Sequence, residues 1–228
     1  MTGLPTFDPI WEQLRNEGRN VDRYPWDVIV SFVYRYAPHD KARSEINILK
    51  VGCGGGNNLW FAAREGFQVS GIDGSPTAIA YARQRFAEDG LYCDLRVGDF
   101  TQIPFESNRF DLVIDRASIT CCGLSTAKKA VSEVRRVLRT GGKFHFNPYS
   151  NLHSSYVSGR HGPDGLILDI SAGTLVGVGQ ICFYGRSEID ALFTEGRELL
   201  TVQHMAIVEQ VQPQFTEHAE WLVIAEKR

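Results

Sequence analysis

The sequence has few cysteines, no long apolar run and little excess of either charge, and each of these absences excludes a class of protein. Its five cysteines are odd in number and show no CxxC spacing, which argues against a disulfide framework and against a thiolate metal site. The histidines and aspartates show no recognisable ligand spacing either. We therefore expect no bound metal.

Two further absences concern membranes and export. The longest charge-free apolar stretch, residues 170–185, is shorter than the roughly 20 residues needed to span a bilayer. Residues 1–11 contain neither a basic leader nor an apolar segment, so no secretory signal is expected. Together with the unpaired cysteines, these features predict a cytoplasmic protein without a membrane span.

The charge balance argues against nucleic acid as a partner. The chain has 24 Lys and Arg against 27 Asp and Glu, and no run of like charges forms a basic patch. Its 228 residues are 43% apolar, which is enough for a hydrophobic core and fits one large domain. The composition therefore predicts a globular protein with a single domain.

Short apolar runs alternate with helix-like segments from residue 46 onward. This alternation is typical of βαβ units, which build a parallel sheet covered by helices on both faces. The predicted strands are residues 46–51, 68–72, 93–97, 110–114, 143–146, 199–208 and 221–225. The last two are too close for a helical crossover and should pair antiparallel. We therefore predict a three-layer αβα sandwich with a mostly parallel seven-stranded sheet and an antiparallel final strand.

The single domain, residues 1–228, divides into four segments. Residues 1–44 form a helical cover, residues 45–147 a ligand-binding half and residues 186–228 a helix with a strand pair. Residues 148–185 are rich in glycine and serine, poor in charge and longer than an ordinary connection. We expect this insertion to cover a substrate.

A glycine-rich turn follows the first predicted strand. Glycines at 52, 54 and 56 allow the backbone to turn tightly and to approach a ligand closely. Asp73 ends the second strand, where a carboxylate can accept hydrogen bonds from both hydroxyls of a ribose. Asp99 and Phe100 follow the third strand and could hold and cover an adenine. A plain βα turn and solvated turn aspartates are the alternatives.

These motifs resemble those of the class I S-adenosylmethionine-dependent methyltransferases. The stretch 51–57 resembles their first motif, 71–73 their ribose-binding strand end and 98–100 their adenine site, while 109–114 and 137–143 resemble later strands. The resemblance covers roughly 46–147 and the final strand pair. It implies S-adenosylmethionine as cofactor, held by Gly52, Cys53, Gly54, Gly56, Asn57, Asn58, Asp73, Gly74, Ser75, Asp99, Phe100, Asp115 and Tyr24.

The chain departs from the family at Lys50, two positions before the first glycine, where the family usually has an acidic residue. The departure leaves open a protein that binds the cofactor as a regulator or scaffold without transferring a methyl group. An NAD-linked oxidoreductase is a weaker alternative, because the GxGxxG pattern needs glycine where this chain has Asn57.

Residues that meet a methyl acceptor should lie at the carboxyl ends of the fourth and fifth strands and in the insertion. We expect His153 to act as a base or to bind the acceptor, and Arg116 to neutralise an anionic acceptor or the cofactor carboxylate, with Tyr149 near them. A solvated loop histidine and a structural salt bridge are the alternatives for the first two. The predicted reaction is O-methylation of a polar or sugar-like small molecule, and the sequence leaves a homodimer open.

Overall fold

The computed structural model describes residues 7–194, 196–211 and 216–228. Its main sheet has seven strands in the order β3-β2-β1-β4-β5-β10-β9, and β10 runs antiparallel to both of its neighbours. This arrangement confirms the predicted α/β fold with an antiparallel final strand. The strands are β1 (Asn47–Val51), β2 (Gln68–Asp73), β3 (Asp94–Val97), β4 (Phe110–Arg116), β5 (Leu138–Asn147), β9 (Arg197–Val208) and β10 (Glu217–Lys227).

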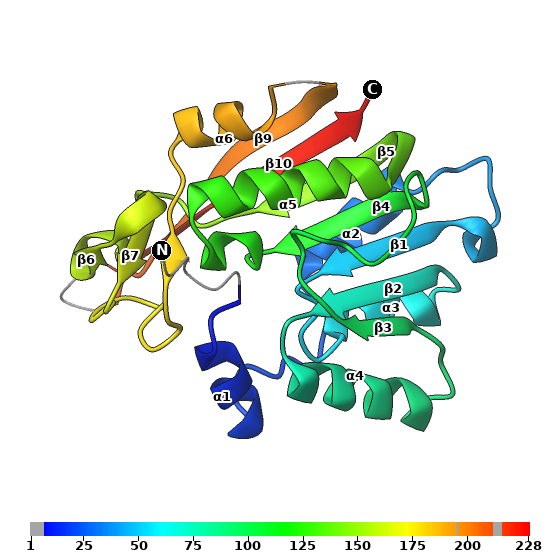
Figure 1. Cartoon of the computed structure of the whole chain (residues 1–228), viewed down its shortest axis with the longest axis horizontal. Helices are drawn as coiled ribbons and strands as arrows, with labels where there is room; N and C mark the ends of the chain where they lie inside the picture. Colours follow the sequence, from blue (N-terminus) through cyan, green and yellow to red (C-terminus); the bar gives the residue numbers. More distant parts are fainter. Residues whose placement is uncertain (1–6, 195, 212–215) are drawn as a thin grey trace.

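Helices cover both faces of the sheet (Figure 1). One hydrophobic cluster joins α5 and α6 to one face, and a second joins α2, α3 and α4 to the other. The helices are α1 (Ile10–Asn16), α2 (Asp27–Tyr36), α3 (Asn57–Arg64), α4 (Pro76–Glu88), α5 (Leu124–Val137) and α6 (Arg186–Leu192). Four 3-10 turns are η1 (Arg43–Glu45), η2 (Ile119–Cys121), η3 (Tyr156–Ser158) and η4 (Pro163–Gly165). In the described part of the chain, no helix is long and apolar enough to cross a bilayer.

Strand β5 follows α5 without a connecting turn and starts irregularly. Gly141 would fit a residue just past a helix end, but α5 already stops at Val137 and β5 begins at Leu138. Gly141 has φ +78° within β5, where the register against β4 shifts between Phe110 and Leu112. The glycine therefore permits an irregular start of the strand rather than capping the helix.

The insertion, residues 148–185, contains a small antiparallel sheet of its own. Its strands are β6 (Arg160–His161), β7 (Leu166–Leu168) and β8 (Ile181–Cys182). A separate cluster of buried residues, including Ile167, Leu175 and Phe183, packs beneath it. In Figure 1 this lobe stands to one side of the main sheet, beyond the ends of β4 and β5.

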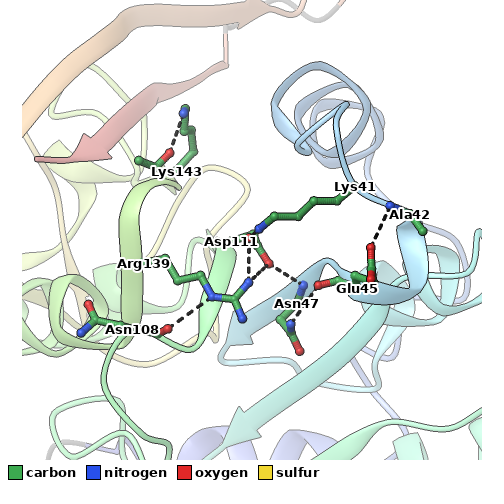
Figure 2. Close-up of polar contacts among 9 residues, drawn as sticks. Lys41, Ala42, Glu45, Asn47, Asn108, Asp111, Arg139 and Lys143 are labelled. Carbon is green, nitrogen blue, oxygen red and sulfur yellow. Dashed lines mark hydrogen bonds and ion pairs between the residues drawn. The ribbon is translucent and has the colours of Figure 1, made fainter.

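At the amino-terminal ends of the central parallel strands, Asp111 of β4 connects its own strand to three other segments (Figure 2). Its carboxylate accepts hydrogen bonds from Lys41 Nζ (2.9 Å), the Asn47 backbone N–H (2.8 Å) and Arg139 Nη1 (2.7 and 2.9 Å). Burial alone would raise the pKa of Asp111, but these donors outweigh it and hold the pKa below its usual value. The carboxylate therefore fixes the starts of β1, β4 and β5 relative to one another.

We predict that Asp111→Asn lowers the free energy of unfolding by about 2 kcal/mol at neutral pH, because buried donors lose a charged acceptor. Because the folded pKa is depressed, the stabilisation is complete above the unfolded pKa and is lost as pH falls through the folded pKa. Urea unfolding at several pH values measures this change. Asp190→Asn, which removes an exposed i,i+4 ion pair with Arg186, is the matched control and should change stability by less than ~0.5 kcal/mol. Equal effects of the two variants would contradict the assigned role.

Candidate functional site

A cavity of about 330 Å³ lies at the carboxyl ends of β1, β2 and β4. Its wall is formed by the glycine turn, by residues of α1 and by residues of the insertion. This is the edge where open α/β sheets bind ligands. In the described part of the chain, no group of histidines, cysteines or carboxylates could hold a metal ion.

The glycine turn needs glycine for geometric reasons. Gly52, Gly54 and Gly56 have φ values of +59°, +53° and +78°, a region that residues with a Cβ adopt at a cost. A Cβ on Gly52 would also lie 2.0 Å from Ser118 Oγ. Gly52 and Gly54 line the cavity, as expected, together with Cys53. Gly56 does not, because it faces α4, where a Cβ would lie 3.2 Å from Ala82 Cβ.

Asp73 holds the turn from the neighbouring strand. Its Oδ2 accepts a hydrogen bond from Gly54 N–H at 2.8 Å, and its Oδ1 accepts one from Ser75 N–H at 2.9 Å. Asp73 and Gly74 both line the cavity. Each carboxylate oxygen can accept a second hydrogen bond. Asp73 can therefore fix the turn and still receive two hydroxyls of a ligand.

Asn57 and Asn58, the first residues of α3, attach the N-terminal segment to the turn. Asn57 Nδ2 donates to the Tyr24 carbonyl at 2.9 Å, and Asn58 Oδ1 accepts from the Trp26 N–H at 3.0 Å. Both asparagines line the cavity, but the Tyr24 side chain is 69% exposed and lies outside its wall. Tyr24 thus contributes through its backbone, which revises the expectation that its ring contacts the cofactor.

Lys50 lies beneath the turn. Its ammonium donates to the Gly52 carbonyl at 2.9 Å and lines the cavity, while burial lowers its pKa. Asp115 is fully buried behind the wall, where Oδ1 accepts from the N–H groups of Ser118 and Ile119, both at 3.0 Å. Burial raises the pKa of Asp115 to about 6. Asp115 therefore supports the turn after β4 rather than facing a ligand.

Only part of the predicted adenine-binding segment, residues 98–100, lines the cavity. Phe100 and Gly98 line the cavity, whereas Asp99 lies outside it and accepts hydrogen bonds from Thr101 N–H (2.7 Å) and Oγ1 (2.8 Å). Ser75 is also outside the wall and caps α4 by accepting from Ala78 N–H at 3.0 Å. In this structure Asp99 and Ser75 shape the adjoining turns.

Helix α1 covers the cavity; it belongs to the predicted helical cover, but none of its residues was among the predicted site residues. Trp11 and Arg15 line the wall. Glu12 accepts hydrogen bonds from Ser75 Oγ and, at 2.6 Å, from Thr77 Oγ1, while Asp8 Oδ2 accepts from Gln180 N–H at 3.0 Å. Helix α1 is thereby attached to the start of α4 on one side and to the insertion on the other.

The far end of the cavity is polar. Arg116 lines it, forms an ion pair with Glu220 (3.0 Å) and lies over the Trp26 ring at 4.4 Å. Tyr149 is also in the wall, and burial raises its pKa to about 12. The structure thus brings two of the three predicted catalytic residues to one place.

His153, the third, lies one layer behind the wall. It is 1% exposed, its Nδ1 accepts from Ser155 N–H at 3.0 Å, and burial with His218 nearby lowers its pKa to about 4. The expectation that His153 meets the acceptor directly is therefore revised, because its ring packs edge-on against Tyr149 and His218 instead.

His218 is another wall residue that the sequence analysis did not single out. Its Nδ1 lies 2.9 Å from Thr174 Oγ1, and its Nε2 lies 3.5 Å from Glu220 Oε2. The expected final strand started at residue 221, but β10 begins at Glu217. An antiparallel final strand starts at the edge where the parallel strands end. His218 and Glu220 are two residues apart in this strand, so their side chains lie on the same face of the sheet. That signal was present in the sequence.

Comparison with known proteins agrees with this geometry. Residues 48–142 match a family described as a methyltransferase domain. The sarcosine/dimethylglycine N-methyltransferase of Aphanothece halophytica is 34% identical over 102 residues, which are 43% of this chain and 36% of that one. A solved SAM-dependent methyltransferase from Methanosarcina mazei has a TM-score of 0.70 at 19% identity, covering 90% of this chain and 98% of that one.

Residues 48–142 thus match a methyltransferase domain, and the fold is that of a solved SAM-dependent methyltransferase. The expected fold and cofactor class are thus confirmed, and the glycine cradle with Asp73 beside it fits that cofactor. The chain spans well under half the length of the relatives that it matches in sequence. The [4+2]-cyclase SpnF has the same fold, with a TM-score of 0.63 at 18% identity over 96% of this chain and 91% of that one. The fold alone therefore does not identify a reaction.

We predict that Asp73→Ala weakens binding of S-adenosylhomocysteine by at least tenfold, because hydrogen bonds to a charged acceptor contribute about 1.5 to 3 kcal/mol each. Titration calorimetry measures the change. Asp99→Ala is the comparison, since Asp99 lies outside the wall, and it should weaken binding less. Near-normal affinity of the Asp73 variant would contradict the ribose assignment.

Proposed function

We propose that the protein is an S-adenosylmethionine-dependent methyltransferase that methylates an oxygen atom of a small polar molecule. One observation carries the proposal. A single cavity joins the glycine turn and Asp73 at one end to a polar wall of Tyr149, Thr174 and His218 at the other. A cofactor bound at the turn would therefore share an enclosure with its acceptor.

Different residues along the cavity would bind different parts of the cofactor. Asp73 would bind the ribose, Phe100 would cover the adenine, and the turn at Gly52 and Gly54 would lie against the methionine part. The bound cofactor supplies an electrophilic methyl group on a sulfonium. Helix α1 and the insertion exclude water, so the chain mainly aligns the acceptor with that methyl group.

The polar wall supports a hydroxyl acceptor, because such an acceptor gains from a base that takes its proton. His153 Nδ1 accepts the Ser155 N–H, which assigns its own proton to Nε2, 3.1 Å from Thr174 Oγ1 and 3.2 Å from His218 Nδ1. His218 Nδ1 is therefore the unprotonated nitrogen, and its Nε2–H faces Glu220.

With its Nδ1 unprotonated, His218 would be able to act as the base. Thr174 is exposed and belongs to the insertion, so an acceptor hydroxyl can replace its Oγ1 at His218 Nδ1. The proton would pass to Nδ1, and the Glu220 carboxylate would stabilise the imidazolium that forms. His153 would hold the ring of His218 in place without touching the acceptor.

The proposal is tested with methyl-labelled S-adenosylmethionine and panels of small alcohols, sugars, carboxylic acids and amines, followed by mass spectrometry of the products. We expect transfer to a hydroxyl compound. Transfer only to amines would contradict the oxygen assignment. Tight binding of S-adenosylhomocysteine without transfer would support a regulator or scaffold, and binding of NAD in its place would support an oxidoreductase.

We predict that His218→Ala lowers kcat for the hydroxyl acceptor by about 10² to 10⁴-fold while leaving the affinity for S-adenosylhomocysteine within about twofold. Steady-state kinetics and calorimetry measure the two quantities. His204→Ala is the matched control, because His204 contacts Ser150 and Trp221 outside the cavity wall. Unchanged turnover of the His218 variant would remove it from the mechanism.

A further inference from the structure

Two cations beside the glycine turn have no carboxylate partner. Lys50 and Arg15 both line the cavity, and among the described residues neither has a carboxylate oxygen within ion-pairing distance. The other charged groups of the wall differ. Arg116 is paired with Glu220, and both Asp8 and Asp73 accept backbone N–H groups. The wall also contains Asp22, whose field acts on Arg15 together with that of Asp73. Lys50 is thus a wall cation without an ion pair, and a ligand anion can pair with it.

Lys50 is the more deeply buried of the two cations. It projects from β1, is 3% exposed, and its ammonium donates to the carbonyls of Gly52 (2.9 Å) and Val51 (3.5 Å). An ammonium has three N–H donors, so one remains for another acceptor. Arg15 lies on the covering helix α1, where its Nη1 donates to the Arg19 carbonyl at 3.4 Å.

Two carboxylates, Asp115 and Asp73, act on Lys50 through their fields, but neither lies within ion-pairing distance of its ammonium. Asp115 acts on Lys50 through its field, but its Oδ1 accepts from Ser118 and Ile119 and the residue lies behind the cavity wall. A cation buried without an ion pair is costly, and a ligand anion would reduce that cost. A charged ligand group is thus favoured at this position.

We propose that Lys50 binds the carboxylate of the cofactor's amino-acid end. The inference rests on the proposed function, since it assumes that S-adenosylmethionine occupies the cavity. The family that this chain resembles usually has an acidic residue at this position, so the charge presented to the amino-acid end is reversed here. Lys50 then has two tasks: it fixes the Gly52 carbonyl beneath the turn, and it directs its remaining N–H to the ligand carboxylate.

The test compares three ligands by titration calorimetry on the wild type and on Lys50→Met. S-Adenosylhomocysteine carries the whole amino-acid end, its decarboxylated analogue lacks only the carboxylate, and 5′-methylthioadenosine lacks the amino-acid end altogether. We expect the wild type to bind S-adenosylhomocysteine about ten- to a hundredfold more tightly than the decarboxylated analogue. In Lys50→Met this preference should fall to about twofold or less, whereas loss of the Gly52 contact would weaken the binding of all three ligands by a common factor.

Two controls keep the outcomes distinct. Lys143→Met removes a lysine of β5 that pairs with Glu226 away from the cavity, and it should retain the wild-type preference. Lys50→Gln repeats the test if the methionine variant does not fold. An unchanged preference in either folded Lys50 variant would overturn the inference. NAD binding that depends on Lys50 would also overturn it, in favour of a phosphate ligand. Failure of the wild type to bind 5′-methylthioadenosine and S-adenosylhomocysteine would instead contradict the proposed function.

Discussion

The left-handed turn at the end of β1 is the constraint on which the site depends. Its glycines can bring the backbone close to a ligand only because two charged side chains hold the turn from opposite sides. Asp73 accepts the Gly54 N–H from the neighbouring strand, and Lys50 donates to the Gly52 carbonyl from below. Both groups also line the cavity, so the contacts that order the turn are the ones that present charge to a ligand.

The sheet positions the site, whereas helix α1 and the insertion enclose it. Buried apolar residues pack on both faces of the sheet, and Asp111 fixes the starts of three of its strands, so the strand ends that carry the site are rigidly placed (Figure 2). Helix α1 and the insertion lie over those ends and are attached to each other through Asp8 and Gln180. A rigid edge beneath covering segments suits a reaction in which the protein mainly aligns two small molecules.

Much of the fold could be predicted because local patterns and long-range packing agree. The strands alternate with helices, and the Ser75-Pro76 pair starts α4 as its capping chemistry requires. The site was predictable where glycine or a strand-end carboxylate fixes position, as at Gly52 and Asp73. The place of His153 was not predictable, because packing and not a motif puts this residue of the insertion behind the wall. His218 of β10 could have been found, because an antiparallel final strand starts at the edge that carries the site. A motif gives a position along the chain but not the direction in which a residue faces. For this reason three predicted cofactor-binding residues, Asp99, Gly56 and Tyr24, lie outside the cavity wall.

The central claim is that the cavity binds S-adenosylmethionine along the glycine turn, with its ribose at Asp73. A crystal structure of the protein saturated with S-adenosylhomocysteine tests this claim most directly. We expect both ribose hydroxyls within hydrogen-bonding distance of the Asp73 carboxylate and the thioether directed toward Tyr149 and His218. A ligand bound elsewhere, or an empty cavity in crystals grown at saturating ligand, would contradict it.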